Sequence, residues 1–160
     1  MIFLIRHASA GSRYDFDGDD ADRPLDEGGS QEAQQISEAL RTRPIKKIMS
    51  SRAVRCQQSI APLARQLNLE IEIEPNLFEG SHDFATTLIK SFFSYPYDVV
   101  ACSHGDVIPE ILGDLIEEGL QIRGGRSCAE SSIWVLSTSN EGQMSGSYFS
   151  SPLEFGRSVE

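Results

Sequence analysis

Three apolar segments of this chain run directly into arginine, histidine and serine side chains. The first segment, at the N-terminus, closes with the pentad Ile5-Arg6-His7-Ala8-Ser9, and Ser50–Arg55 and Ser103–Gly105 follow the other two. Such runs are typical of parallel strands buried on both faces, and the carboxyl ends of these strands form the sheet edge where ligands bind. Arginine and histidine side chains gathered at that edge suit a phosphate group, because they donate hydrogen bonds to its oxygens. The residues are Arg6, His7, Arg55 and His104.

The acidic balance of the chain limits the partners that it can have. The 160 residues include 24 acidic and 14 basic side chains, which gives a formal net charge of −10. A charge of this sign disfavours nonspecific binding to nucleic acid polymers and to anionic membranes. A phosphate site in such a chain therefore requires a local cluster of positive charge. The length of the chain suits one domain with its own core.

The cysteines and the short apolar runs predict where this chain resides. Cys56, Cys102 and Cys128 form no Cys-x-x-Cys motif, and their odd number argues against a disulfide framework. The run Ile2–Ile5 is shorter than the roughly 7–15 residues of a signal-peptide core, and no run reaches the ~20 residues of a membrane span. We therefore expect a cytoplasmic protein. We expect no metal and no cofactor, since no His-Glu-x-x-His or similar spacing is present.

Alternating strand and helix patterns predict a single three-layer α/β/α domain, with a mostly parallel central sheet and a C-terminal antiparallel hairpin. Asp26 is a candidate N-cap for the helix that begins at Glu27, and Pro62 predicts a kink or a later start of the next helix. We expect the domain to span residues 1–152 and residues 153–160 to form a loose tail. The predicted strands are 2–6, 45–51, 69–74, 97–103, 132–138 and 144–149, and the predicted helices are 27–40, 53–67, 83–93 and 106–117.

Four motifs in this order resemble those of the histidine phosphatase superfamily, whose fold is phosphoglycerate mutase-like. The resemblance runs from residue 2 to about residue 152, and Ala8 stands where the family usually has Gly. The motifs are Leu4-Ile5-Arg6-His7-Ala8, Arg23-Pro24-Leu25 followed by Gly29, Ser50-Ser51 with Arg55 and Gln58, and Ser103-His104.

Two branches of that superfamily are similar to this chain. The small size, Arg23-Pro24-Leu25 and the late Ser150-Ser151-Pro152 resemble the SixA-type phosphohistidine phosphatases. Gly18-Asp19-Asp20, and Val54-Arg55-Cys56 with Pro62-Leu63-Ala64, resemble the phosphatase-like domain attached to some actinobacterial Nudix hydrolases.

The resemblance implies a role for each basic residue of the motifs. His7 is the implied nucleophile, which forms a phosphohistidine that water later hydrolyses. Arg6, Arg55 and His104 are the implied ligands of the phosphoryl oxygens, and Ser9 is a further candidate ligand. A nucleophilic imidazole must be neutral at its attacking nitrogen, and we expect the charges of Arg6 and Arg55 to keep it so.

Three functions are considered, and the first of them, with protein phosphohistidine as the substrate, is the one that we expect. The first is a metal-independent phosphatase of protein phosphohistidine, as in the SixA branch. The second is a phosphatase of small phosphomonoesters or nucleotides, because Glu79 falls where many family phosphomonoesterases carry their proton donor. The third is an inactive phosphate-binding module. Arg13, Arg23 and Arg126 are candidates for reading the rest of a substrate, and the Asp15–Asp20 loop is expected to be polar and near the site.

Overall fold

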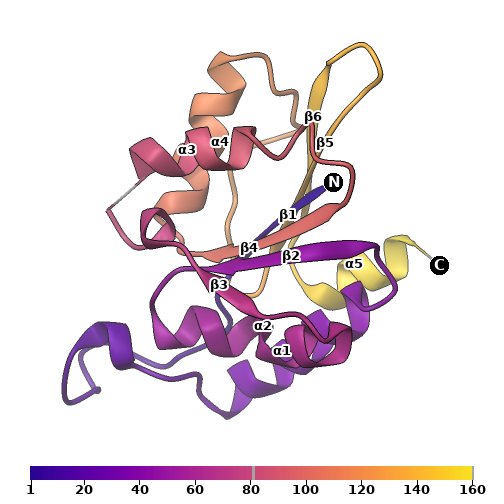
Figure 1. The fold of residues 1–160 in the computed structure, drawn as a ribbon. Helices are drawn as coiled ribbons and strands as arrows, with labels where there is room; N and C mark the ends of the chain where they lie inside the picture. The colour runs from indigo at the N-terminus through magenta and orange to yellow at the C-terminus, as the bar shows by residue number, and fades with distance from the viewer. Residues whose placement is uncertain (81, 160) are drawn as a thin grey trace.

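The computed structural model describes residues 1–80 and 82–159, which form a six-stranded sheet between two layers of helices (Figure 1). The strand order is β3-β2-β4-β1-β5-β6. The first four strands of this order are parallel to one another, and β5 runs antiparallel to both of its neighbours, β1 and β6. The expected α/β/α architecture with a C-terminal hairpin is therefore confirmed. The strands are β1 Ile2–Arg6, β2 Ile45–Ser50, β3 Ile71–Ile73, β4 Asp98–Ser103, β5 Ile133–Thr138 and β6 Met144–Phe149.

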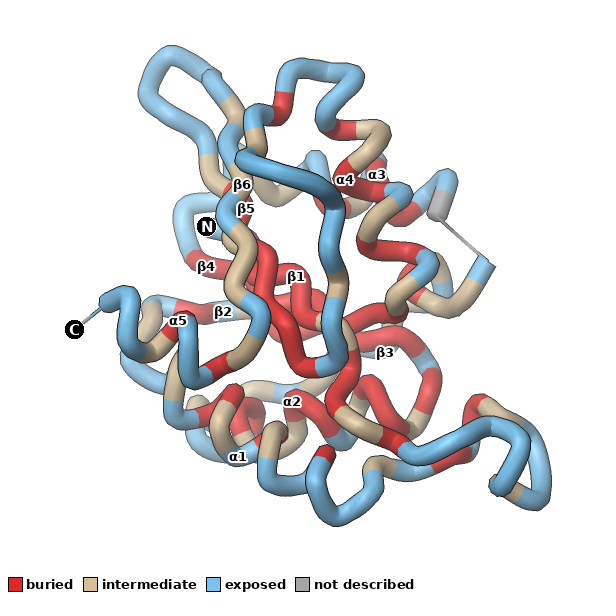
Figure 2. The backbone as a smooth tube through the Cα atoms, turned by 180° about the vertical axis from the view of Figure 1, so that it is seen from behind, coloured by how far each residue is buried: buried red, intermediate tan, exposed pale blue. Residues whose placement is uncertain are grey.

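Each face of the sheet buries one half of the alternating apolar side chains. In β1, Ile2 and Leu4 join the core beneath α3 and α4, whereas Phe3 and Ile5 join the core beneath α1, α2 and α5. Figure 2 shows β1 and β4 buried at the centre of the molecule. The helices are α1 Glu27–Leu40, α2 Val54–Leu67, α3 His82–Lys90, α4 Val107–Glu117 and α5 Pro152–Ser158, with short 3-10 turns at Asp20–Asp22 and Pro75–Leu77.

Most of the predicted elements are confirmed to within two residues of their ends. Asp26 caps α1 as expected, since its side chain accepts a hydrogen bond from the Gly29 N–H. The predicted later start at Pro62 is wrong, because α2 begins at Val54 and continues through this proline. The helix predicted to reach residue 93 ends at Lys90 and is followed by turns.

The expectation of a loose C-terminal tail is wrong. Helix α5 begins with Ser151 as its N-cap and Pro152 in its first turn, and the Ser151 side chain accepts from the Glu154 N–H. Phe155 is buried, and its ring meets those of Phe3 and Phe149 at centroid distances of 5.9 and 5.2 Å. The signal was present in the sequence, because serine at an N-cap followed by proline favours a helix start.

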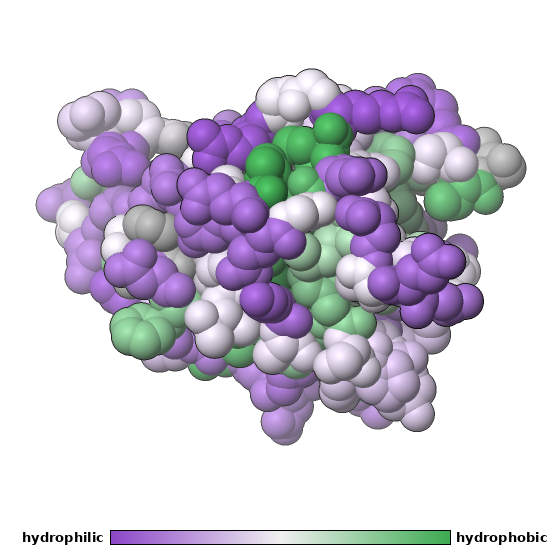
Figure 3. All heavy atoms as spheres, turned by 90° about the horizontal axis from the view of Figure 1, so that it is seen from above, coloured by the Kyte–Doolittle hydropathy of each residue, from purple (hydrophilic) through white to green (hydrophobic). Residues whose placement is uncertain are grey.

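At the carboxyl ends of β1 and β4, the chain leaves the sheet toward opposite faces. Helix α1 follows β1 on one face of the sheet, and α4 follows the neighbouring β4 on the other face. Loops that diverge in this way leave a crevice at the carboxyl ends of the two strands. Figure 3 shows hydrophilic residues over much of the face seen from above, with a group of hydrophobic residues near its centre and smaller ones toward its edges. No helix among the described residues is long and apolar enough to cross a membrane.

The first turn of α1 presses against the loop that follows β1. A Cβ atom added at Gly29 would lie 1.9 Å from the carbonyl oxygen of Ser9, so only glycine fits there. Asp26 strengthens the same junction, since its carboxylate accepts from the Ser9 hydroxyl at 2.6 Å and from the Gly11 N–H at 3.1 Å. The contact fixes the loop that carries the residues after β1.

We predict that Gly29→Ala lowers the free energy of unfolding by roughly 1–3 kcal/mol, because the new methyl group collides with backbone atoms. Gly28→Ala is the matched control in the same helix turn, since its Cβ would meet nothing closer than 3.5 Å. That control should be neutral or more stable by up to about 1 kcal/mol. Urea denaturation of both variants measures the difference, and equal stabilities would contradict the predicted collision.

Candidate functional site

His7 lies directly after β1 with its ring in a defined tautomer. Its backbone N–H donates to the Ser103 carbonyl at 3.0 Å, which ties it to the end of β4. Its Nδ1 lies 2.8 Å from the carbonyl oxygen of Ala8, and a carbonyl can only accept. The proton of the neutral ring is therefore on Nδ1, and the lone pair is on Nε2. The Ala8 N–H in turn donates to the Ser59 hydroxyl at 2.8 Å.

Burial keeps the His7 ring neutral. The pKa of His7 is lowered from 6.5 to about 3, with desolvation as the largest cause, and the hydrogen bond to Ala8 opposes the shift. Repulsion from His104, Arg55 and Arg6 contributes to the same lowering. The arginine charges therefore act in the expected direction, but the removal of the ring from water is the larger cause.

Arg55, at the start of α2, is a fully buried cation between two carboxylates. Its Nη2 donates to Glu79 Oε1 at 2.7 Å and lies 3.4 Å from Asp20 Oδ2, and its Nη1 donates to the Asp20 carbonyl at 2.8 Å. Its Nε is buried without a hydrogen-bond partner among the described residues. Buried donors in native proteins are nearly always paired, so the unpaired Nε indicates that a ligand can supply its partner.

Arg6 has the same property on the other side of His7. Its Nη1 donates to the Cys128 carbonyl at 2.8 Å, whereas its Nε is also buried and unpartnered within the described part of the chain. A Cβ at Gly105 would lie 2.9 Å from the Arg6 guanidinium carbon. Glycine at this position therefore lets Arg6 lie across the loop after β4.

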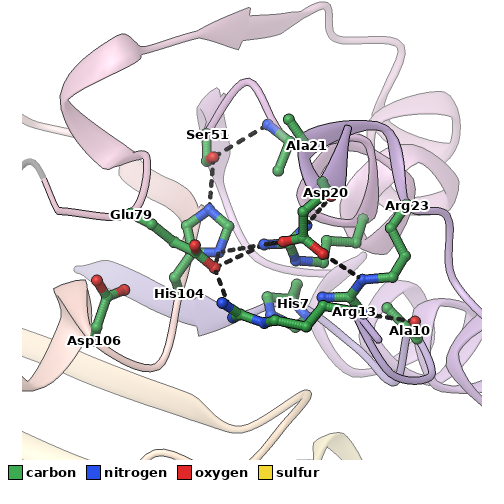
Figure 4. Close-up of polar contacts among 12 residues, drawn as sticks. His7, Ala10, Arg13, Asp20, Ala21, Arg23, Ser51, Glu79, His104 and Asp106 are labelled. Atoms are coloured by element: carbon green, nitrogen blue, oxygen red, sulfur yellow. Dashed lines mark hydrogen bonds and ion pairs between the residues drawn. The ribbon is translucent and has the colours of Figure 1, made fainter. Parts of the chain in front are cut away.

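His104 joins the cluster from the end of β4. Its Nε2 lies 2.8 Å from the Ser51 hydroxyl, which orients the ring. Its Nδ1 lies 3.4 Å from Glu79 Oε1 and 3.5 Å from Arg55 Nη2. The ring centroid is 5.5 Å from that of His7. Figure 4 shows the two histidines side by side with Glu79 directed toward them.

Arg6, His7 and Glu79 line a pocket of about 720 Å³, which is within the usual size of a small-molecule site. The structure thus brings together Arg6, His7, Arg55, His104 and Glu79.

Ser9 differs from the others, because its hydroxyl donates to Asp26 and its backbone N–H to Glu32. The geometry therefore makes Ser9 part of the loop anchor. The pocket is lined by Arg6, His7, Gly11, Ser12, Arg13, Tyr14, Arg23, Glu79, Gly105, Asp106 and Glu130.

The sequence did not reveal two of the supporting contacts. Asp20 pairs with Arg55 from a loop that was predicted only to be polar and near the site. Ser59 lies one helical turn after Arg55 and binds both the Arg55 carbonyl and the Ala8 N–H. Spacing by four residues could have suggested that Ser59 and Arg55 share a face, but not that this face meets Ala8. The described residues hold no group of three or more metal-ligating side chains.

We predict that protonation of His7 destabilises the protein at acid pH. The unfolded chain takes up this proton near pH 6.5 and the folded protein only near pH 3, so stability falls as the pH falls between these values. Relative to His7→Asn, wild type should lose about 1.4 kcal/mol of unfolding free energy per pH unit from about pH 5.5 to pH 4. Urea denaturation across this range measures the loss. Parallel stability curves for the two proteins would contradict it.

Comparison with known proteins identifies the relatives of this chain. The family model of the histidine phosphatase superfamily (branch 1) matches residues 2–88. An 8-oxo-(d)GTP phosphatase of Mycolicibacterium smegmatis is 32% identical over 155 residues, which cover 94% of this chain and 48% of that protein. This chain therefore spans about half the length of that relative.

Solved structures share the fold at lower identity. The protein histidine phosphatase SixA complexed with tungstate matches with a TM-score of 0.74 and 21% identity, over 95% of this chain and 97% of that one. A mycobacterial glucosyl-3-phosphoglycerate phosphatase complexed with VO3 matches with a TM-score of 0.72 and 14% identity, over 94% and 98%. The fold is phosphoglycerate mutase-like, and the chain belongs to the histidine phosphatase superfamily.

Proposed function

We propose that this protein is a metal-independent phosphatase that hydrolyses small phosphomonoesters through a phosphohistidine on His7. The observation that carries the proposal is the neutral Nε2 of His7 beside two arginines whose Nε groups are buried and unpartnered in the described structure. A phosphoryl group supplies the missing partners of both arginines, because a guanidinium matches its oxygens in geometry and charge.

In the first step, Nε2 of His7 attacks the phosphorus atom while the bond to the leaving oxygen breaks. Arg6, Arg55 and His104 neutralise the charge on the phosphoryl oxygens, and such positioning and neutralisation supply most of what phosphoryl transfer needs. Water then attacks the phosphohistidine, which releases inorganic phosphate and restores the neutral ring. The charges of the two arginines are thus available without a metal ion.

Glu79 is the proposed proton donor to the leaving group. Its Oε1 lies at the junction of Arg55 and His104, beside the place where the phosphoryl group binds. An alkoxide is a poor leaving group and needs a proton as the bond breaks, and a positioned acid contributes about 10²–10⁴-fold. The presence of this carboxylate in the site favours phosphomonoesters over phosphohistidine. The similarity to a named 8-oxo-(d)GTP phosphatase supports nucleotides within this class.

Protein phosphohistidine is the second candidate substrate. The pocket is lined in part by the exposed residues Ser12, Arg13 and Tyr14, so a side chain on the surface of another protein could reach it. An imidazole is far less basic than an alkoxide and leaves without the same need for a proton. An inactive phosphate-binding module is disfavoured, because the nucleophile and all the proposed phosphate ligands are present together.

Rapid mixing with ³²P-labelled substrate, followed by a quench, tests the nucleophile. We expect a phosphoprotein that is stable in base and labile in acid, as a phosphorylated imidazole is. His7→Ala should form none of it and should lose turnover. Undiminished turnover by His7→Ala would show that another group attacks phosphorus.

A Glu79→Gln variant tests the choice between the two substrates. Hydrolysis of alkyl phosphomonoesters should fall by about 10²-fold, while hydrolysis of phosphohistidine falls much less. Glu72→Gln is the matched control. Glu72 lies on the edge strand β3, pairs with Lys47 of β2 and is not one of the pocket residues. Equal losses on both substrates would show that Glu79 holds the site together and is not a selective acid.

A further inference from the structure

Two of the three arginines whose roles were open are bound into the fold. Arg23 is buried, and its guanidinium donates to Asp20 Oδ1 at 2.8 Å and to the Ala10 carbonyl at 2.6 Å. Arg126 donates to the Pro109 carbonyl at 2.9 Å and lies so close to Gly113 that a Cβ there would come within 2.3 Å of Nη1. Arg23 is therefore held in the fold, and Arg126 is exposed and is not among the residues that line the pocket.

Arg13 differs from both. It lines the pocket, its side chain is 54% exposed, and its charged contact is Glu79 Oε1 at 3.8 Å, beyond hydrogen-bond distance. Figure 4 shows its guanidinium directed toward Glu79. Because Glu79 Oε1 also binds Arg55, a single carboxylate oxygen lies between the buried arginine and the exposed one.

The loop holds Arg13 at a fixed place although the loop is exposed. The Tyr14 N–H donates to the Ser12 hydroxyl and the Asp15 N–H to the Ser12 carbonyl, so Arg13 and Tyr14 occupy the corner of a turn. The base of the loop is fixed on one side by the Gly11 N–H, which donates to Asp26, and on the other by Arg23. Arg13 is thus a positioned cation at the mouth of the pocket.

We propose that Arg13 binds a second phosphate group of the substrate, next to the one that is cleaved. This inference rests on the proposed phosphatase function. Arg6, Arg55 and His104 are committed to the scissile phosphoryl group, which leaves Arg13 free for the adjacent anion. The carboxylates of Asp106 and Glu130 line another part of the wall and repel a second phosphate there. The preferred substrate class is therefore an organic diphosphate or bisphosphate.

The reaction on such a substrate follows the same two steps. The terminal phosphoryl group moves to Nε2 of His7, and the electron pair of the broken P–O bond leaves with the remaining monophosphate. Water then releases inorganic phosphate from His7. The product carries one phosphate group and cannot occupy both sites at once. It therefore binds more weakly than the substrate and departs.

Steady-state kinetics on matched substrate pairs tests the proposal. The pairs are ADP with AMP, and fructose 1,6-bisphosphate with fructose 6-phosphate, which separate nucleotides from sugars as the source of the second phosphate. Arg13→Ala should lower kcat/KM by about 10-fold or more for the substrates with two phosphates. It should change the values for the single-phosphate substrates by no more than about threefold. The matched control is Arg41→Ala, because Arg41 is 46% exposed and pairs with Glu38 at 3.3 Å on α1.

Two outcomes would overturn the inference while leaving the phosphatase function intact. Equal losses on all four substrates would place Arg13 on the scissile phosphate, and no loss on any would place it outside the site. Calorimetric binding of pyrophosphate and of orthophosphate to wild type and Arg13→Ala does not depend on turnover. Arg13→Ala should weaken pyrophosphate by about 10-fold and leave orthophosphate unchanged. Wild type that turns over no phosphate ester but shows this binding difference would refute the proposed function alone.

Discussion

The parallel pairing of β1 with β4 is the constraint on which the whole site depends. The register places Arg6 opposite Ser103, and one further hydrogen bond joins the His7 N–H to the Ser103 carbonyl. His7 and His104 therefore leave the sheet at the same level on adjacent strands. A shift of one residue in this register would turn every side chain of β1 to the other face and move His7 away from its partner.

Electrostatics in the site follow from burial of this edge. The protein has a net charge of −10, yet Arg55 is fully buried beside His7. A buried guanidinium is costly unless it is paired, and Asp20 and Glu79 supply the pairing. The same burial keeps His7 neutral. One physical cause thus gives both a nucleophile with a free lone pair and a cation that is held ready for an anion.

Sequence patterns predicted the helices and strands that local residue order determines. Continuous apolar runs gave the central strands, the 3.6-residue period gave α1 and α4, and Asp26 was identified as a cap. The C-terminal helix was missed because it buries only Pro152 and Phe155, and because the contact of Phe155 with Phe3 joins opposite ends of the chain. In the site, motif order brought the main residues together. The partners of Ser9 and the contact of Asp20 with Arg55 could not be predicted, since long-range packing decides them.

The loop after β1 separates the part of the site that must be constant from the part that can vary. Its base is fixed by Gly29, Asp26 and Arg23, each of which contacts backbone atoms of the loop. Its corner carries Arg13, which lines the pocket with a side chain that is 54% exposed, and Tyr14, which is 92% exposed. Substitution at the corner leaves the nucleophile and its arginines undisturbed. A fold of this kind can therefore retain one phosphoryl-transfer machinery and change what surrounds the scissile phosphate, as rigid scaffolds with functional loops commonly do.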